Sequence, residues 1–138
     1  MNSGFFKSPT PDFENEYFHQ YAESLGSSST SSTSFQTKLT LTTPNLPAGR
    51  YRIQWAYAYG HGQADRRSEH RIYVDAATAV YTIDPEEARG TSFYYPAGGF
   101  DEVTFGADGI HTIEIQYRCV NTSSMVIKEA RLEIWRID

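Results

Sequence analysis

Apolar and polar side chains alternate with a period of two through most of the chain from Ser34 onward. Such a period predicts strands with one buried face, because successive side chains of a strand point to opposite sides of a sheet. The alternation is clearest where polar or small residues separate five apolar ones: Tyr51, Ile53, Trp55, Tyr57 and Tyr59. We therefore expect a strand over residues 50–59 that buries these five side chains, since inward faces mix aliphatic and aromatic residues.

Seven further segments have strand-like patterns between turn signals: residues 35–41, 71–75, 79–83, 91–95, 100–105, 111–120 and 125–137. Many short strands without a long helix between them predict an all-β antiparallel sandwich or barrel, and eight strands suit a jelly roll. We expect a jelly-roll-like β-sandwich of about eight strands, with Gly98 and Gly99 preceding the strand that starts at Phe100. The inward side chains are predicted by parity: Phe35, Thr37, Leu39, Leu41, Ile113, Ile115, Tyr117, Cys119, Ala130, Leu132 and Ile134.

The N-terminal part has a different pattern. Phe13, Tyr17, Tyr21 and Leu25 recur every four residues, which predicts a short helix over residues 12–25 that ends at Gly26. A run of Ser and Thr follows, and its composition is typical of a flexible linker. The sequence thus predicts two parts: an extended or short-helical arm with a linker over residues 1–33, and a sandwich domain over residues 34–138. Removal of the arm is expected to leave the sandwich folded and to abolish its attachment to partner proteins.

Length and charge narrow the class of protein. A chain of 138 residues favours one domain, and its net charge of -5 with scattered Lys and Arg argues against nucleic-acid binding. No window is apolar over the roughly 18 residues that a membrane helix needs, and the N-terminus lacks the features of a secretory signal. The single cysteine, Cys119, has no partner for an internal disulfide, which fits synthesis in a reducing cytosol.

Candidate catalytic and metal-binding residues form no pattern with a known mechanism. His61 and His70 flank a polar loop, but a zinc site needs three or four converging ligands, so solvated loop histidines are expected. His111 is expected to be structural, and His19 to face solvent or a partner. Cys119 shares the parity of inward residues and is expected to be a buried thiol. No nucleophile elbow or phosphate-binding loop occurs, so we expect no enzyme activity, no metal and no cofactor.

Aromatic residues are the strongest candidates for binding a partner. Phe93, Tyr94 and Tyr95 cannot all point inward, and Trp135 alternates with inward residues of its strand, so some of these rings are expected at an interface. Aromatic residues of the arm are expected to join them. The candidate partner-binding residues are Phe5, Phe6, Phe13, Tyr17, Tyr21, Tyr94, Tyr95 and Trp135.

Three segments carry a resemblance to a known group of proteins: Leu41–Trp55, Gly109–Arg118 and Ala130–Arg136. In strand and turn pattern, the chain from Ser34 to Asp138 resembles small β-sandwich virion proteins of tailed bacteriophages and prophages. The resemblance implies a head decoration (cement) protein or a tail accessory protein, made in the host cytoplasm and located in the virion. It also implies binding to the major capsid protein or other virion proteins, for which we expect the N-terminal arm and the sheet edges to be used, and a homo-oligomer, most often a trimer.

Two other functions are weighed against this one. A carbohydrate-binding module, or a tail adhesion protein that binds a surface glycan, would present exposed Tyr or Trp rings on one face. An enzyme on a jelly roll would need a cleft with converging His or acidic side chains, and the absence of catalytic motifs counts against it.

Overall fold

The computed structural model describes residues 18–63, 66–83, 94–120 and 124–138, and these residues form strands and loops only. They contain no helix long and apolar enough to cross a membrane. The strands are β1 (His19–Ser24), β2 (Ser28–Thr30), β3 (Gln36–Thr42), β4 (Gly49–His61), β5 (Ser68–Val74), β6 (Thr78–Ile83), β7 (Tyr95–Phe105), β8 (Thr112–Cys119) and β9 (Met125–Arg136).

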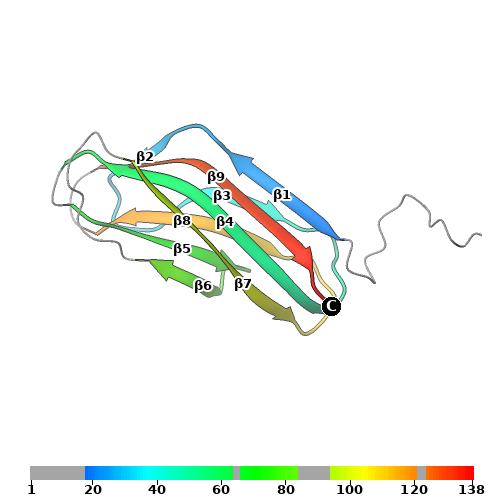
Figure 1. Cartoon of the computed structure of the whole chain (residues 1–138). Coiled ribbons are helices and arrows are strands. Elements are labelled where there is room, and N and C mark those ends of the chain that lie inside the picture. Colours follow the sequence, from blue (N-terminus) through cyan, green and yellow to red (C-terminus); the bar gives the residue numbers. More distant parts are fainter. Residues whose placement is uncertain (1–17, 64–65, 84–93, 121–123) are drawn as a thin grey trace, which may run out of the picture.

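The strands form two antiparallel sheets packed face to face (Figure 1). Sheet A has the order β1-β9-β4-β7, with β2 also pairing with β9, and sheet B has the order β3-β8-β5-β6. The predicted all-β, jelly-roll-like sandwich is therefore confirmed, with nine strands in the described residues where about eight were expected.

The core lies between the sheets and follows the predicted parity. All five apolar side chains predicted to face inward from β4 are buried, as are the inward side chains predicted for β8 and β9. Of the inward side chains predicted for residues 35–41, however, only Leu39 and Leu41 are buried, because the register of β3 shifts between Thr37 and Leu39. The shift buries Lys38 and places Phe35 under the guanidinium groups of Arg71 and Arg118, so Phe35 is not part of the core.

A bulge in β9 allows apolar side chains on both sides of it to point into the core. Glu129 has a φ of 55°, and the pairing of β9 with β4 shifts there by one residue. An extra residue in one strand reverses which side chains face inward. As a result, Met125 and Ile127 before the bulge and Ala130 after it are all fully buried.

The pair Gly98–Gly99 lies inside β7 and does not precede a strand, which corrects the prediction. Gly99 pairs with Trp55, and a Cβ atom at Gly99 would lie 3.0 Å from the Trp55 indole. The ring therefore needs a glycine opposite it, and a glycine inside a strand commonly marks such a close approach. Pro96 is tolerated in the same strand because β7 is at the edge of sheet A.

The helix predicted for residues 12–25 is wrong over its described part. Residues 19–24 form β1, which pairs with β9 in an unbroken register from His19↔Trp135 to Ser24↔Ala130. Without β1, β9 would present a row of unpaired backbone groups at the edge of the sheet. A short isolated helix is marginal in water, so pairing with a long strand prevails.

The Ser-rich run is likewise part of the sandwich, and not a free linker. Ser28–Thr30 forms β2 on β9, and the Ser32 carbonyl accepts a hydrogen bond from the Cys119 amide at 2.9 Å. The buried Lys38 ammonium donates to the Gly26 carbonyl at 2.6 Å and to the Ser28 hydroxyl at 2.9 Å. Burial lowers the pKa of Lys38. Residues 18–33 thus belong with the domain that was predicted to start at residue 34.

We predict that two N-terminal deletions differ sharply in stability. Deletion of residues 2–17 keeps every described strand, whereas deletion of residues 2–33 removes β1, β2 and the partners of Lys38. The longer deletion is expected to lower the midpoint of thermal unfolding by at least about 10 °C relative to the shorter one, or to yield insoluble protein. Circular dichroism melting measures the difference. Equal midpoints would mean that β1 and β2 contribute nothing to the fold.

Candidate functional site

The outward face of sheet A gathers aromatic and hydrogen-bonding side chains. These side chains alternate along their strands with buried or half-buried ones, so they point away from the core. The cross-strand register places them in three rows that run from β1 to β7: His19–Trp135–Arg52–Glu102, Tyr21–Glu133–Gln54–Phe100 and Glu23–Arg131–Ala56–Gly98. We call this surface the sheet A face.

Large exposed apolar side chains concentrate on the sheet A face. Tyr21 is 62% exposed, Phe100 61% and Tyr94 48%. The other large apolar side chains exposed in the described residues, Leu25, Ile110 and Val120, lie in loops. Exposed apolar side chains that share one sheet face indicate a contact surface, whereas isolated ones need no explanation.

Small residues form a low strip between two of these rings. Ala56 pairs with Gly98, and Ala58 pairs with Pro96, on the stretch of β4 and β7 between Phe100 and Tyr94. The Lys128 ammonium lies 3.8 Å from the centre of the Tyr94 ring and borders the strip. We call the residues Ala56, Ala58, Pro96, Gly98, Phe100 and Tyr94 the apolar strip.

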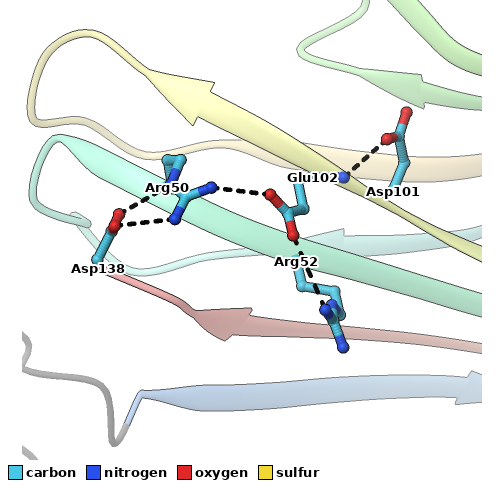
Figure 2. A network of polar contacts seen from close by, with 5 residues as sticks. All are labelled: Arg50, Arg52, Asp101, Glu102 and Asp138. Carbon is cyan, nitrogen blue, oxygen red and sulfur yellow. Dashed lines mark hydrogen bonds and ion pairs between the residues drawn. The ribbon is translucent and has the colours of Figure 1, made fainter.

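A network of charges ties one corner of the sheet A face together (Figure 2). The Arg50 guanidinium donates to Asp138 at 2.9 Å and to Glu102 at 3.0 Å, and Glu102 also lies 3.8 Å from Arg52. The hydrogen bond from Arg50 lowers the pKa of the Asp138 carboxyl. All four side chains are substantially exposed, so these pairs orient the side chains more than they stabilise the fold.

A second cluster lies across β1 and β9. The His19 ring stacks on Trp135 at 5.0 Å between centres and on Tyr21 at 6.3 Å, and its Nε2 atom is 2.8 Å from Glu133. His19 therefore meets neighbours of its own chain on the sheet A face. The Arg131 guanidinium donates to Glu23 at 3.2 Å in the adjacent row.

On the outward face of sheet B, aromatic and polar side chains contact one another. The Arg71 guanidinium lies 3.9 Å from the centres of both the Phe35 and Tyr73 rings and donates to Gln116 at 2.7 Å. Gln116 in turn donates to Glu114 at 3.0 Å. Phe35 and Tyr73 are only half-exposed, whereas Tyr21 and Phe100 are among the most exposed apolar side chains of the described residues, so sheet A offers the better binding surface.

The structure brings some of the predicted partner-binding residues together and separates others. Tyr21 and Trp135 lie in adjacent rows of the sheet A face, and Tyr94 borders its apolar strip. Tyr95 points inward and packs on Tyr59 at 5.5 Å between ring centres. The remaining candidates lie outside the described residues: Phe5, Phe6, Phe13 and Tyr17.

Sequence reasoning missed Phe100, Arg52 and Gln54 as members of the same surface. The alternation along the strands could have indicated that they point outward. Arg52 and Gln54 alternate with buried residues of β4, and Phe100 lies two residues from the outward Glu102. The register that aligns these strands could not be obtained from parity alone.

The prediction that His61 and His70 are solvated loop residues is wrong. His61 ends β4 and His70 lies in β5, and they are 4% and 1% exposed. We assign a hydrogen-bonded chain in which the Tyr57 hydroxyl donates to His70 Nδ1 at 2.8 Å and His70 Nε2 donates to the Ser68 hydroxyl at 2.7 Å. The Ser68 hydroxyl then lies 3.5 Å from His61 Nε2. Burial raises the pKa of Tyr57, which keeps this donor protonated.

These hydrogen-bonded residues include a serine and histidines, the residue types of a catalytic nucleophile and its base, but their position does not suit catalysis. Ser68 is completely buried, so no substrate reaches its hydroxyl oxygen. His111 stacks on Phe105 at 3.5 Å between ring centres and lies 2.8 Å from Asp75, a position that fits the predicted structural role. Cys119 is buried as predicted, and burial raises the pKa of its thiol. No group of three or more metal-ligating side chains occurs among the residues that the structure describes.

Comparisons with known proteins identify the fold and go no further. No protein-family model matches the chain, and no curated protein matches its sequence. The dimeric latent PorU from Porphyromonas gingivalis superposes with a TM-score of 0.59 at 8% identity, over 90% of this chain and 13% of that one. The VP2 subviral particle protein of infectious bursal disease virus superposes with a TM-score of 0.58 at 12% identity, over 86% of this chain and 32% of that one. The chain therefore matches a minor part of each longer protein, and the likeness concerns the sandwich fold alone.

We predict that the buried His61 makes the protein less stable in mild acid. Burial lowers the pKa of His61, so the unfolded chain binds the proton more tightly than the folded chain does. The free energy of unfolding is therefore highest above the pKa of His61 in the unfolded chain, about 6.5. It falls as the pH drops below this pKa, until the folded chain also binds the proton. Urea unfolding between pH 8 and pH 5.5 is expected to show a loss of about 1 kcal/mol. His61→Gln should flatten this dependence, and the exposed His19→Gln serves as the control that keeps it.

Proposed function

We propose that the chain is a virion structural protein of a tailed bacteriophage, of the capsid decoration or cement type, and that it has no catalytic activity. It attaches to neighbouring particle proteins, the major capsid protein foremost, through the sheet A face. An accessory position in the tail is the alternative within the same proposal.

The observation that carries the proposal is the apolar strip with its flanking rings. Phe100 and Tyr94 project from either end of a floor made of Ala56, Ala58, Pro96 and Gly98. Aromatic anchors around a low apolar floor, with charged residues at the border, have the composition of protein interfaces. Charged pairs such as Arg50–Glu102 lie at the rim, where they contribute to orientation and association rate.

Two further points support a role in a particle. The strand and turn pattern of residues 34–138 resembles that of small phage virion proteins, and a sandwich of the same fold occurs in the VP2 subviral particle of infectious bursal disease virus. A flat sheet face of this size makes a modest contact, and repetition on a symmetric shell multiplies modest contacts into firm attachment. The fold likeness by itself carries no function.

The direct test is the copy number of this protein in purified particles. Particles released after induction of the strain that encodes the chain are banded on a density gradient, and quantitative mass spectrometry compares the chain with the major capsid protein. A copy number of the same order as that protein is expected for decoration, and a few copies per particle would place the chain in the tail. Absence from the particles would overturn the proposal.

We predict that the apolar strip is needed for attachment. Phe100→Ser removes the more exposed of the two rings of the strip without touching the core, so the variant should fold with unchanged thermal stability. Particles assembled with this variant as their only source of the chain should carry at least tenfold fewer copies after gradient purification. Ile110→Ser is the matched control, because Ile110 is 65% exposed but lies in a loop. Equal losses from both variants would contradict the assignment of the strip.

A further inference from the structure

The strand β7 forms one edge of sheet A, and no strand of the described residues pairs with its outer side. Hydrogen bonds of β4 show which backbone groups of β7 face this open edge. The Arg50 amide donates to Asp138 and the Arg50 carbonyl accepts from Ile137, so the backbone groups of Arg50 point away from β7. Arg50 pairs with Thr104, and the alternation along an antiparallel pair then directs every second residue of β7 to the open edge. The residues concerned are Pro96, Gly98, Phe100, Glu102 and Thr104.

Two of these positions have no hydrogen-bond donor to offer another strand. Pro96 lacks an N–H group. The Glu102 amide already donates to the Asp101 side chain at 2.8 Å, a contact that Figure 2 shows. Prolines and charged side chains of this kind limit pairing at an exposed edge. Between them, the backbone groups of Gly98 and Phe100 face the open edge and make no hydrogen bond within the described part of the chain.

The open stretch from Gly98 to Phe100 is complementary to itself. If a second copy runs antiparallel with its Phe100 opposite Gly98, both residues donate to and accept from the other copy. The same register sets Pro96 opposite Glu102, so the positions without a donor meet each other at the ends of the paired stretch. If one copy is shifted by two residues in either direction, a carbonyl of Gly98 or Phe100 faces a position that has no donor to offer. Since backbone groups inside a ladder need partners, the first register is favoured.

Side chains fit the same register. Phe100 is 61% exposed, and opposite it would lie Gly98 of the second copy, whose own neighbour on β4 is Ala56, so small residues leave room for the ring. Charge acts in the same direction, because the Asp101 carboxylate makes no ion pair within the described part of the chain. A register with Phe100 opposite Glu102 would place the Asp101 carboxylates of the two copies directly opposite each other, which is unfavourable. The favoured register keeps them apart.

We propose that two copies of this chain associate through their β7 edges, antiparallel and about a twofold axis beside Gly99. Sheet A then continues from one copy into the other, and the two apolar strips meet at the axis. Pairing of one edge with the same edge of a second copy is complete with two copies. The geometry therefore fits a dimer, and not the trimer that the resemblance to virion proteins implies.

This inference goes beyond attachment to a particle and does not depend on it. A dimer would present two attachment surfaces at once, and two linked contacts bind a repetitive shell more firmly than one. Association is measured on the purified chain, whereas attachment is measured by the copy number in particles. Either result can therefore be negative while the other is positive.

The test measures the mass of the purified full chain by analytical ultracentrifugation from micromolar to millimolar concentration. A monomer–dimer equilibrium is expected. Phe100→Pro removes an edge-facing N–H group from the paired stretch of each copy and should raise the dissociation constant of the dimer at least about tenfold. Thr104→Pro is the matched control, because it removes an N–H group from the same edge outside that stretch and should leave the constant unchanged. Both amides face away from β4, so both variants should keep the pairing of β7 with β4.

Amide hydrogen exchange of the wild-type chain tests the register without any substitution. As the concentration rises through the equilibrium, exchange at the Gly98 and Phe100 amides should slow at least about tenfold, whereas exchange at the Thr104 amide should not change. A monomer at millimolar concentration, a trimer, or equal weakening of the dimer by both proline variants would overturn the proposal. Exchange at Gly98 and Phe100 that does not depend on concentration would do the same.

Discussion

The antiparallel pairing of β4 with β9 is the contact on which the rest of this molecule depends. These two strands form the centre of sheet A, and their inward side chains, from Tyr51 to Tyr59 and from Met125 to Ile134, supply much of the buried core. The register of this pairing shifts by one residue where Glu129 adopts a left-handed conformation and forms a bulge in β9, and the two strands stay paired on both sides of it. Without that bulge, either Ile127 or Leu132 would point to solvent. The same register also aligns the outward residues of β4 and β9, to which the rows of the sheet A face add one residue each from β1 and β7.

The two outward faces of the sandwich show how similar side chains can have opposite effects. On sheet B, Arg71 lies between Phe35 and Tyr73, and its partners Gln116 and Glu114 extend the network, so the aromatic faces are occupied. On sheet A, Arg52 lies over the Phe100 ring and beside Glu102, yet Phe100 is still 61% exposed. Cross-strand neighbours thus decide how far an arginine covers an aromatic surface.

The interior contains more polar chemistry than its aromatic composition suggests. Tyr57, His70, Ser68 and His61 form a chain between apolar residues of both sheets, linking β4 to β5. Each buried polar atom of such a chain needs its partner, since an unsatisfied one costs about 1–3 kcal/mol. The chain therefore makes the packing of the two sheets specific, and it makes the fold sensitive to protonation of His61.

Alternation along the chain by itself determined the fold class and most of the core, because the two-residue period of a strand is a local property. It identified the buried sets of β4, β8 and β9 and the buried thiol of Cys119. It also placed Tyr94 and Trp135 among residues with an outward role, whereas Tyr21 was chosen as an aromatic residue of a helix that does not form. Tertiary structure decided what local pattern cannot encode. Residues 19–24 became a strand because β9, more than a hundred residues later, offered an edge to pair with. His61 and His70 became buried because β4 and β5 face each other across the core, where Tyr57 and Ser68 supply hydrogen bonds. The rows of the sheet A face exist only after four strands from distant parts of the chain are in register, since each row takes one side chain from each strand.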